Sequence, residues 1–247
     1  MNERITSVAN PRIKDLVSIL SNQGSNKEEF FLVEGFHLVD MARTSGCLVE
    51  VYALKPYKFE KCYTVTENVL NRITSTKTPQ GIVGKCRKSA PREPFSSNTI
   101  FFLDGVQDPG NVGTIFRTLL ALGFREIFLS PTCASPYNPK TILASQGAIF
   151  RELHQISGAE SVLLFAKKNK YQIVTTEVDE NAKSYEILEK YIGKLLVVFG
   201  NESTGVSMLM KEKKDFAVYI PIEGIDSLNV GIATGIIANA LRKRSTI

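Results

Sequence analysis

The sequence predicts an α/β protein whose C-terminal part is built on a parallel sheet, and three observations lead to this fold class. Strand-like segments alternate with segments of helical spacing along most of the chain. Runs such as "TIFFLDGV" and "KLLVVFG" are almost continuously apolar, which is typical of strands covered on both faces. The Pro- and Ser-rich segment 88–98 separates this region from a smaller α/β unit. We therefore expect two domains, residues 1–93 and 94–247.

The first domain is predicted to contain three helices and four strands. Ile13, Leu16, Val17 and Leu20 recur at helical spacing and indicate a helix within residues 1–20. The polar segment 21–29 is expected to be a loop. The remaining elements are expected in the order strand 30–35, helix 36–46 ended by a glycine, strand 48–54, strand and helix within 62–73, and strand 81–87.

The second domain is predicted to alternate regularly between the two element types. Strands are expected at 99–106, 126–130, 153–158, 171–178, 194–200 and 216–222. Helices are expected at 110–123, 138–150, 159–170, 185–192, 203–213 and 227–244. No repeat or low-complexity segment interrupts this order.

Composition restricts the class of protein. The chain has 247 residues, 43% of them hydrophobic and 22% charged, which is ordinary for a globular protein. No apolar run reaches the length of a membrane span, and the first 20 residues lack the apolar core of a secretory signal. We therefore expect a cytoplasmic protein without membrane contact. Four cysteines without a CxxC pair and only two histidines predict no metal site.

The positive charge is concentrated in the first domain. Residues 1–93 carry 14 Lys and Arg against 10 Asp and Glu, whereas residues 94–247 carry 16 against 15. A modest basic excess is compatible with contact to phosphates, although a solvated surface explains it as well.

In three segments, polar residues follow the carboxyl end of a predicted strand. Parallel sheets bind their ligands at the carboxyl ends of the strands. In "FLDGVQDPGNVGTIFRT", Asn111 stands at a helix start as a candidate cap, and Arg117 is either functional or a salt-bridged or snorkelling side chain. In "FGNESTG", Glu202 either caps a helix or acts in a site. In "IPIEGIDSLNV", Ser227 as an N-cap leaves Asn229 unexplained.

Taken together, the three segments closely resemble the three motifs of the SpoU/TrmH family of RNA ribose 2′-O-methyltransferases, which belongs to the SPOUT class. The residues that carry the resemblance are Asn111, Gly113 and Arg117; Gly200, Glu202 and Gly205; and Ile220, Pro221, Ser227, Leu228 and Asn229. The front part resembles the family's substrate-binding domain through "ITSVANPRIKDL" and "FFLVEGFHLVDMA". The resemblance implies a SPOUT fold with a deep trefoil knot and a small L7Ae-like N-terminal domain that binds RNA.

The resemblance also implies a mechanism. The methyl donor would be S-adenosylmethionine, bound near Gly200, Ile220, Leu228 and Thr175 in the knotted cleft. The residues implied in catalysis are Arg117, Asn111, Glu202, Ser227 and Asn229. Because a guanidinium stays protonated at ordinary pH, we prefer Arg117 as a positioner of phosphate and hydroxyl over Arg117 as the base. No metal would be needed, and the family works as homodimers.

Several alternative functions stay open. A nucleotide- or dinucleotide-binding enzyme is disfavoured because neither the P-loop nor the G-x-G-x-x-G pattern is present. A non-catalytic RNA-binding module of the same fold is disfavoured by the complete motif set. The separate front domain favours ribosomal RNA over tRNA as the substrate. The sequence does not identify the nucleotide that is modified.

Overall fold

The computed structural model describes residues 4–25, 27–88, 95–151, 153–177 and 181–243. They form two compact units, one of Met1–Ala90 with Ser135–Phe150 and one of Pro91–Ala134 with Arg151–Ile247. Ser135–Phe150, which lies between two stretches of the second unit in the sequence, packs with the first unit. Within it, Gln23 donates its side-chain amide to the carbonyl of Tyr137 at 3.0 Å.

The first unit contains a five-stranded mixed sheet in the order β1-β4-β3-β5-β2. Its strands are β1 (Arg4–Ile5), β2 (Phe30–Glu34), β3 (Leu48–Ala53), β4 (Cys62–Val65) and β5 (Ile82–Arg87). Its helices are α1 (Pro11–Asn22), α2 (Phe36–Thr44), α3 (Glu67–Arg72), α5 (Pro139–Ser145) and the 3₁₀ helix η1 (Ala148–Phe150). Strand β5 is antiparallel to both of its neighbours, whereas β1, β4 and β3 run parallel.

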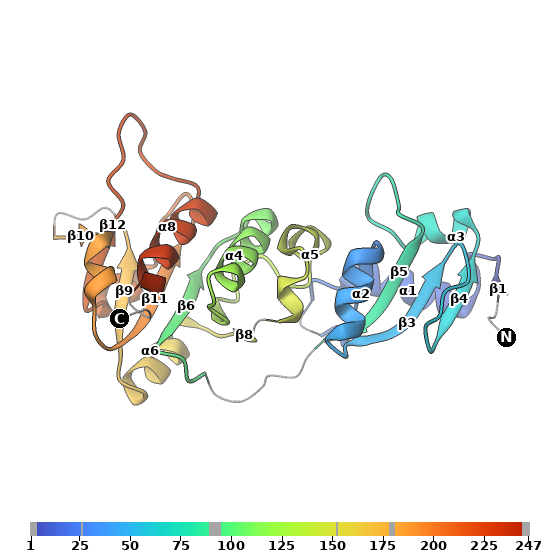
Figure 1. The fold of residues 1–247 in the computed structure, drawn as a ribbon, viewed down its shortest axis with the longest axis horizontal. Helices are drawn as coiled ribbons and strands as arrows, with labels where there is room; N and C mark the ends of the chain where they lie inside the picture. The colour runs from blue at the N-terminus through green and yellow to red at the C-terminus, as the bar shows by residue number, and fades with distance from the viewer. Residues whose placement is uncertain (1–3, 26, 89–94, 152, 178–180, 244–247) are drawn as a thin grey trace. The chain divides into compact units, whose positions relative to one another are not determined.

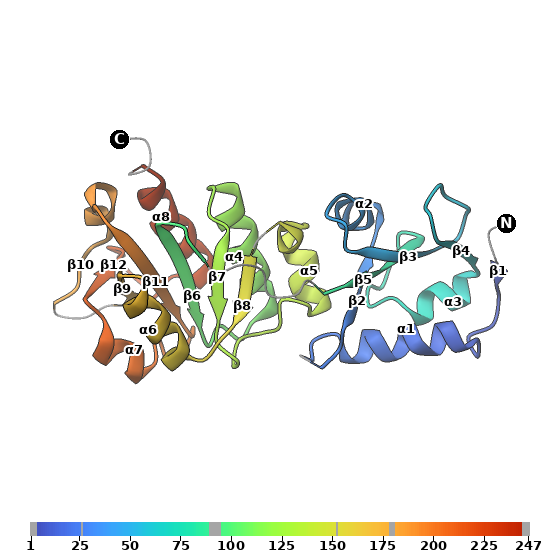
Figure 2. The same cartoon turned by 90° about the horizontal axis from the view of Figure 1, so that it is seen from below.

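Each face of this sheet has its own hydrophobic core, as the period of two along a strand requires. In β2, Leu32 packs with α1 and α3, whereas Phe31 and Val33 pack with α2 on the other face. Figure 2 shows α1 and α3 on one side of the sheet and α2 on the opposite side. Ile142 and Ile149 belong to the α2 side, which explains why Ser135–Phe150 belongs to this unit.

The second unit contains a seven-stranded sheet in the order β10-β12-β9-β11-β6-β7-β8. Its strands are β6 (Thr99–Asp104), β7 (Glu126–Leu129), β8 (Leu153–Ile156), β9 (Tyr171–Thr176), β10 (Lys183–Ser184), β11 (Lys194–Gly200) and β12 (Phe216–Tyr219). Every pairing within it is parallel, which confirms the predicted sheet.

Helices cover both faces of this sheet (Figure 1). They are α4 (Pro109–Ala121), α6 (Ala159–Lys168), α7 (Met208–Lys213), α8 (Val230–Lys243) and the 3₁₀ helix η2 (Tyr185–Lys190). On one face, Phe102 and Val198 pack against α6 and α7. Their strand neighbours Phe101 and Phe199 point to the other face, where α4 and α8 pack together.

Some element boundaries differ from the sequence expectations. Residues 185–190 form a 3₁₀ helix rather than an α-helix, and the helix expected at 203–213 begins only at Met208. The helix expected at 138–150 ends at Ser145, because Gln146 adopts a left-handed conformation with φ 49°. The final helix begins at Val230 rather than Ser227. The short strands β1 and β10 carry no periodic signal, since two residues cannot show one.

The loops that follow β6, β11 and β12 leave the sheet at the carboxyl ends of parallel strands, so they share one edge. Each of the three motif segments contains one of these loops. Within the described part of the chain, no helix combines the length and the hydropathy that crossing a bilayer requires.

Leu196→Ala is expected to lower the free energy of unfolding by about 2–5 kcal/mol, because the fully buried leucine leaves a cavity in the middle of the sheet. The matched control is Leu164→Ala, whose side chain on α6 is 71% exposed, with an expected change below about 0.5 kcal/mol. Urea denaturation of both variants measures the difference. Equal losses would contradict the packing described here.

Candidate functional site

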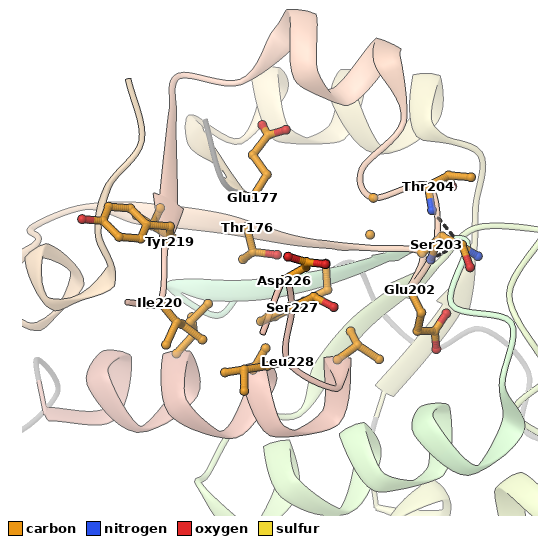
Figure 3. Close-up of a pocket in the computed structure, with 18 of the residues that line it drawn as sticks. Thr176, Glu177, Glu202, Ser203, Thr204, Tyr219, Ile220, Asp226, Ser227 and Leu228 are labelled. Atoms are coloured by element: carbon orange, nitrogen blue, oxygen red, sulfur yellow. Dashed lines mark hydrogen bonds between the residues drawn. The ribbon is translucent and has the colours of Figure 1, made fainter. Parts of the chain in front are cut away.

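A pocket of about 380 Å³ opens at the carboxyl ends of β9, β11 and β12 and is bounded by α8. Its apolar wall consists of Phe199, Val218, Ile220, Ile222, Leu228, Val230 and Ile237. Its polar lining includes Thr176, Glu177, Asn201, Glu202, Ser203, Thr204, Lys211, Asp226 and Ser227. Figure 3 shows Ile220 and Leu228 on the side of α8. An apolar slot with a polar rim and this volume suits a small organic ligand.

Gly200, at the end of β11, has no room for a side chain. A Cβ atom there would lie 2.2 Å from the carbonyl carbon of Gly205 and 2.3 Å from the amide nitrogen of Val206. The turn between them is closed by Asn201 and Gly205, whose backbone amides donate to each other's carbonyl oxygens at 3.0 and 2.9 Å. The absence of a side chain at Gly200 therefore allows the chain to fold back on itself at the pocket wall.

Two polar contacts join the end of β6 to the loop after β11. The Asn201 side-chain amide donates to the carbonyl of Gly105 at 2.8 Å, while its oxygen accepts from the amide of Ser203 at 2.8 Å. The carboxylate of Asp104 accepts from the amide of Ser207 at 2.8 Å. Loops distant in the sequence are thereby fixed to one another, which gives the pocket a preformed wall.

Asn111 connects all three motif segments. Its amide nitrogen donates to the Glu202 carboxylate at 2.7 Å, and its amide oxygen accepts from the Asn229 side chain at 2.8 Å. Asn111 lies in the first turn of α4, three residues after Asp108, whose carboxylate caps that helix. The residue is thus not the cap that the sequence suggested. Its side chain instead links two loops that are 91 and 118 residues further along the chain.

Asn229 caps α8. Its side-chain oxygen accepts from the amides of Gly231 at 2.9 Å and Ile232 at 3.3 Å, while its nitrogen donates to Asn111. The cap is therefore Asn229 and not Ser227, which lies in the preceding loop and lines the pocket. This corrects the interpretation of Ser227 as the N-cap and gives Asn229 the partner that an asparagine at a helix start needs.

Glu177 is held in place by two lysines. Its carboxylate accepts from the Thr175 hydroxyl at 2.7 Å and from Lys214 at 2.8 Å, with Lys211 at 3.4 Å. Burial acts to raise the pKa of Glu177, but the bonds from Lys214, Thr175 and Lys211 together outweigh it and lower that pKa below its usual value. Glu177 is therefore a charged carboxylate whose charge is compensated within the protein.

The structure brings most of the predicted site residues together. Gly200, Ile220, Leu228, Glu202 and Ser227 line the pocket. Asn111 and Asn229 lie outside the lining. Asn111 is bonded to the lining residue Glu202, and Asn229 is bonded to Asn111.

Besides Asn111 and Asn229, two further predicted site residues, Thr175 and Arg117, do not line the pocket. Thr175 is fully buried and binds Glu177, whereas its neighbour Thr176 lines the pocket. Arg117 is exposed on α4, so it does not belong to the core face, and it has no hydrogen-bond or ion-pair partner among the described residues. It lies six residues beyond Asn111, about 9 Å further along the helix axis.

Sequence reasoning missed Glu177, Lys211 and Asp226, all of which line the pocket. Asp226 directly precedes the motif serine Ser227 in the sequence. Glu177 and Lys211 lie in segments with an ordinary charge pattern, so no sequence signal marked them. Among the residues that the structure describes, no group of three or more His, Cys, Asp or Glu side chains is arranged to hold a metal ion.

Comparison with known proteins identifies the family. The model of the SpoU rRNA Methylase family matches residues 98–239, and that of the MRM3-like substrate binding domain matches residues 10–84. The chain is 32% identical to the 23S rRNA (guanosine(2553)-2′-O)-methyltransferase RlmP of Bacillus subtilis, over 97% of this chain and 99% of that protein. The chain belongs to the SpoU rRNA methylase family.

Solved structures show the same fold along the whole chain. The crystal structure of an AdoMet-bound rRNA methyltransferase from Sinorhizobium meliloti superposes with a TM-score of 0.86 at 27% identity, covering 98% of this chain and 97% of that one. The SpoU methyltransferase AviRb from Streptomyces viridochromogenes, in complex with AdoMet, has a TM-score of 0.83 at 20% identity and covers 96% and 98%. These relatives confirm the SPOUT fold, of which a trefoil knot is typical.

Gly200→Ala is expected to lower the free energy of unfolding by about 3 kcal/mol, because a methyl group at this position overlaps backbone that cannot yield without opening the Asn201–Gly205 turn. Gly205→Ala serves as the control. It meets no atom within 4 Å and costs only the strain of its φ of +71°, about 1 kcal/mol. Denaturant unfolding measures the loss of unfolding free energy in both variants. A larger loss in Gly205→Ala than in Gly200→Ala would contradict the expectation.

Asn229→Ala is expected to lower the free energy of unfolding by about 1 kcal/mol, because α8 loses its N-cap. Asn229→Ser keeps a capping oxygen and is expected to stay within about 0.5 kcal/mol of the wild type, although serine is too short to reach Asn111. Thermal unfolding distinguishes the two. If both variants lost the same stability, the contact with Asn111 rather than the cap would stabilise the helix.

Proposed function

We propose that this protein is an S-adenosylmethionine-dependent methyltransferase that modifies a ribose 2′-hydroxyl in ribosomal RNA. The observation that carries the proposal is the junction of Asn111, Glu202 and Asn229, which unites the three family motifs beside a pocket of suitable size. Family membership and the rRNA methyltransferases among the relatives support the same activity.

The pocket residues fit the proposed cofactor. Ile220, Leu228, Val230 and Ile237 offer apolar surface for the adenine ring, and Gly200 contributes backbone to the pocket lining. Carboxylates at the polar end suit a ligand that carries a positive charge. When bound, S-adenosylmethionine supplies an electrophilic methyl group on its sulfonium. Thr176 takes the place beside the cofactor that the sequence had assigned to Thr175.

The chain's own residues position the acceptor. Asn111, Glu202 and Asn229 form a bonded network beside the pocket that fixes the direction of their polar atoms, and Ser227 lines the pocket itself. Such alignment of two reactants can contribute on the order of 7 kcal/mol. Arg117 stays protonated and therefore binds phosphate and orients the hydroxyl rather than removing its proton. Methyl transfer would form the C–O bond, break the C–S bond of the sulfonium to leave a neutral thioether, and release the hydroxyl proton to water.

RNA is the proposed partner of the first unit, which matches a substrate-binding domain and carries the excess of basic residues. Lys85 and Arg87 lie over the ring of Phe30, and Lys88 lies over Tyr137. Cations interleaved with aromatic rings are suited to phosphates and unstacked bases. An rRNA substrate is favoured over tRNA because the rRNA methyltransferase from Bacillus subtilis matches along its full length, first unit included.

We also propose a homodimer in the cytoplasm. Arg117 is exposed outside its own pocket, and on the adjacent helix α8 the apolar Ile232 is 56% exposed. A dimer that covered α4 and α8 would account for both. The cytoplasmic location fits an rRNA substrate.

Arg117→Ala is expected to reduce methyl transfer to rRNA at least about 100-fold, because a positioned charge at the acceptor is lost. The affinity for S-adenosylmethionine should change less than about twofold, since Arg117 does not line the pocket. Arg125→Ala, which removes another exposed arginine of the second unit, should leave both unchanged. Transfer of labelled methyl to purified rRNA and calorimetric titration measure these quantities.

Retained turnover of Arg117→Ala would exclude its central role.

Mapping of 2′-O-methylated nucleotides in rRNA from cells with and without the gene tests the substrate. The proposed function requires one ribose methylation to disappear. If no rRNA site were lost but a tRNA site were, the substrate would be tRNA. A wild-type protein that bound RNA without any methyl transfer would be a binding module.

A further inference from the structure

We infer that Asp226 is a specificity-determining residue that makes the pocket prefer the positively charged methyl donor over its neutral thioether product. The inference rests on the proposed function and deepens it. It follows from how the pocket distributes charge among the carboxylates that line it, which are Glu177, Glu202 and Asp226.

Two of these carboxylates are already engaged by the protein. Glu177 is bonded to Thr175 and Lys214 and lies 3.4 Å from Lys211. Glu202 accepts the amide of Asn111 at 2.7 Å. Figure 3 shows their side chains pointing in opposite directions, Glu177 toward the segment with α7 and Glu202 toward α4. Neither is directed at the middle of the pocket.

Asp226 differs in position and in pairing. Figure 3 shows it in the middle of the lining residues, beside Thr176 and Ser227. It has no hydrogen-bond or ion-pair partner in the described ranges of the chain. Lys211, the cation of the pocket lining, is at the Glu177 carboxylate. Asp226 therefore brings an uncompensated negative charge to the pocket.

A loop rather than a helix or strand carries Asp226. The loop between β12 and α8 turns at Gly224, whose φ of +77° favours glycine. Asp226 is followed by Ser227 and Leu228, both of which line the pocket, and then by the cap Asn229. The cap anchors the loop end, so the carboxylate is held three residues from a fixed point. A loop position of this kind can add a charge to the pocket without disturbing the sheet.

The ligand chemistry makes the charge selective. S-Adenosylmethionine and S-adenosylhomocysteine share the adenosine, the amino group and the carboxylate. They differ in that the sulfur of the first is a sulfonium cation and that of the second is a neutral thioether. An unpaired carboxylate near the sulfur attracts only the first of these sulfurs. A contact with the shared amino group would instead strengthen binding of both ligands equally.

The experiment measures the dissociation constants of both compounds by calorimetry for the wild type, Asp226→Asn and Glu223→Gln. Asp226→Asn keeps the size of the side chain and removes its charge. Glu223→Gln removes a charge from the same exposed loop at a residue that does not line the pocket. We expect Asp226→Asn to raise the dissociation constant of S-adenosylmethionine about tenfold, or about 1.4 kcal/mol. The dissociation constant of S-adenosylhomocysteine should change less than about twofold. Glu223→Gln should change neither.

The ratio of the two dissociation constants decides the outcome. An unchanged ratio in Asp226→Asn, including an equal loss for both ligands, would overturn the inference. If Glu223→Gln changed this ratio as much as Asp226→Asn does, the inference would also be overturned. The effect would then come from the total negative charge of the loop and not from Asp226. Retained binding of S-adenosylhomocysteine shows that the variant is folded. If the wild type bound neither compound, the proposed function itself would fail, which is a separate result.

Discussion

The side-chain amide of Asn111 is the interaction on which the site depends. One asparagine uses its donor for Glu202 and its acceptor for Asn229, so three segments that are far apart in the sequence meet at a single residue. A hydrophobic contact could hold the segments together but would not fix the direction of their polar atoms. A network in which every member has a partner does both, provided that it is fully satisfied. Burial of the strands supplies the stability, and the amide supplies the alignment.

Stability and chemistry are kept in different parts of the second unit. The central strands contribute fully buried side chains such as Phe101, Leu196 and Phe199, while the loops at their carboxyl ends contain the polar residues. The loops are nevertheless fixed, because Asp104 and Asn201 bind backbone groups of neighbouring turns. The pocket is thus built from segments that are irregular in conformation but restrained by hydrogen bonds.

The regular elements were predictable because burial on both faces leaves a strong pattern. Continuous apolar runs identified β6 and β11, and the three motifs identified the pocket wall at Gly200, Ile220 and Leu228. Asp108 and Asn229 show the limit of local patterns, since several polar residues in a row can each cap a helix and only packing selects one. Glu177 and Lys211 could not be found from sequence, because their role comes from the pairing of separate elements.

The contacts of Ser135–Phe150 have a consequence for how this chain can be divided. Its sequence neighbours on both sides belong to the second unit, yet Ile142 and Ile149 complete a core of the first. The polypeptide therefore passes between the units at three places, near residues 90, 134 and 150. Cutting once after residue 93 would leave the front fragment with an open apolar face. The first unit is one packed body, but it is encoded by two separate stretches of the gene. Recombination that replaced the front domain would therefore have to replace the internal segment as well.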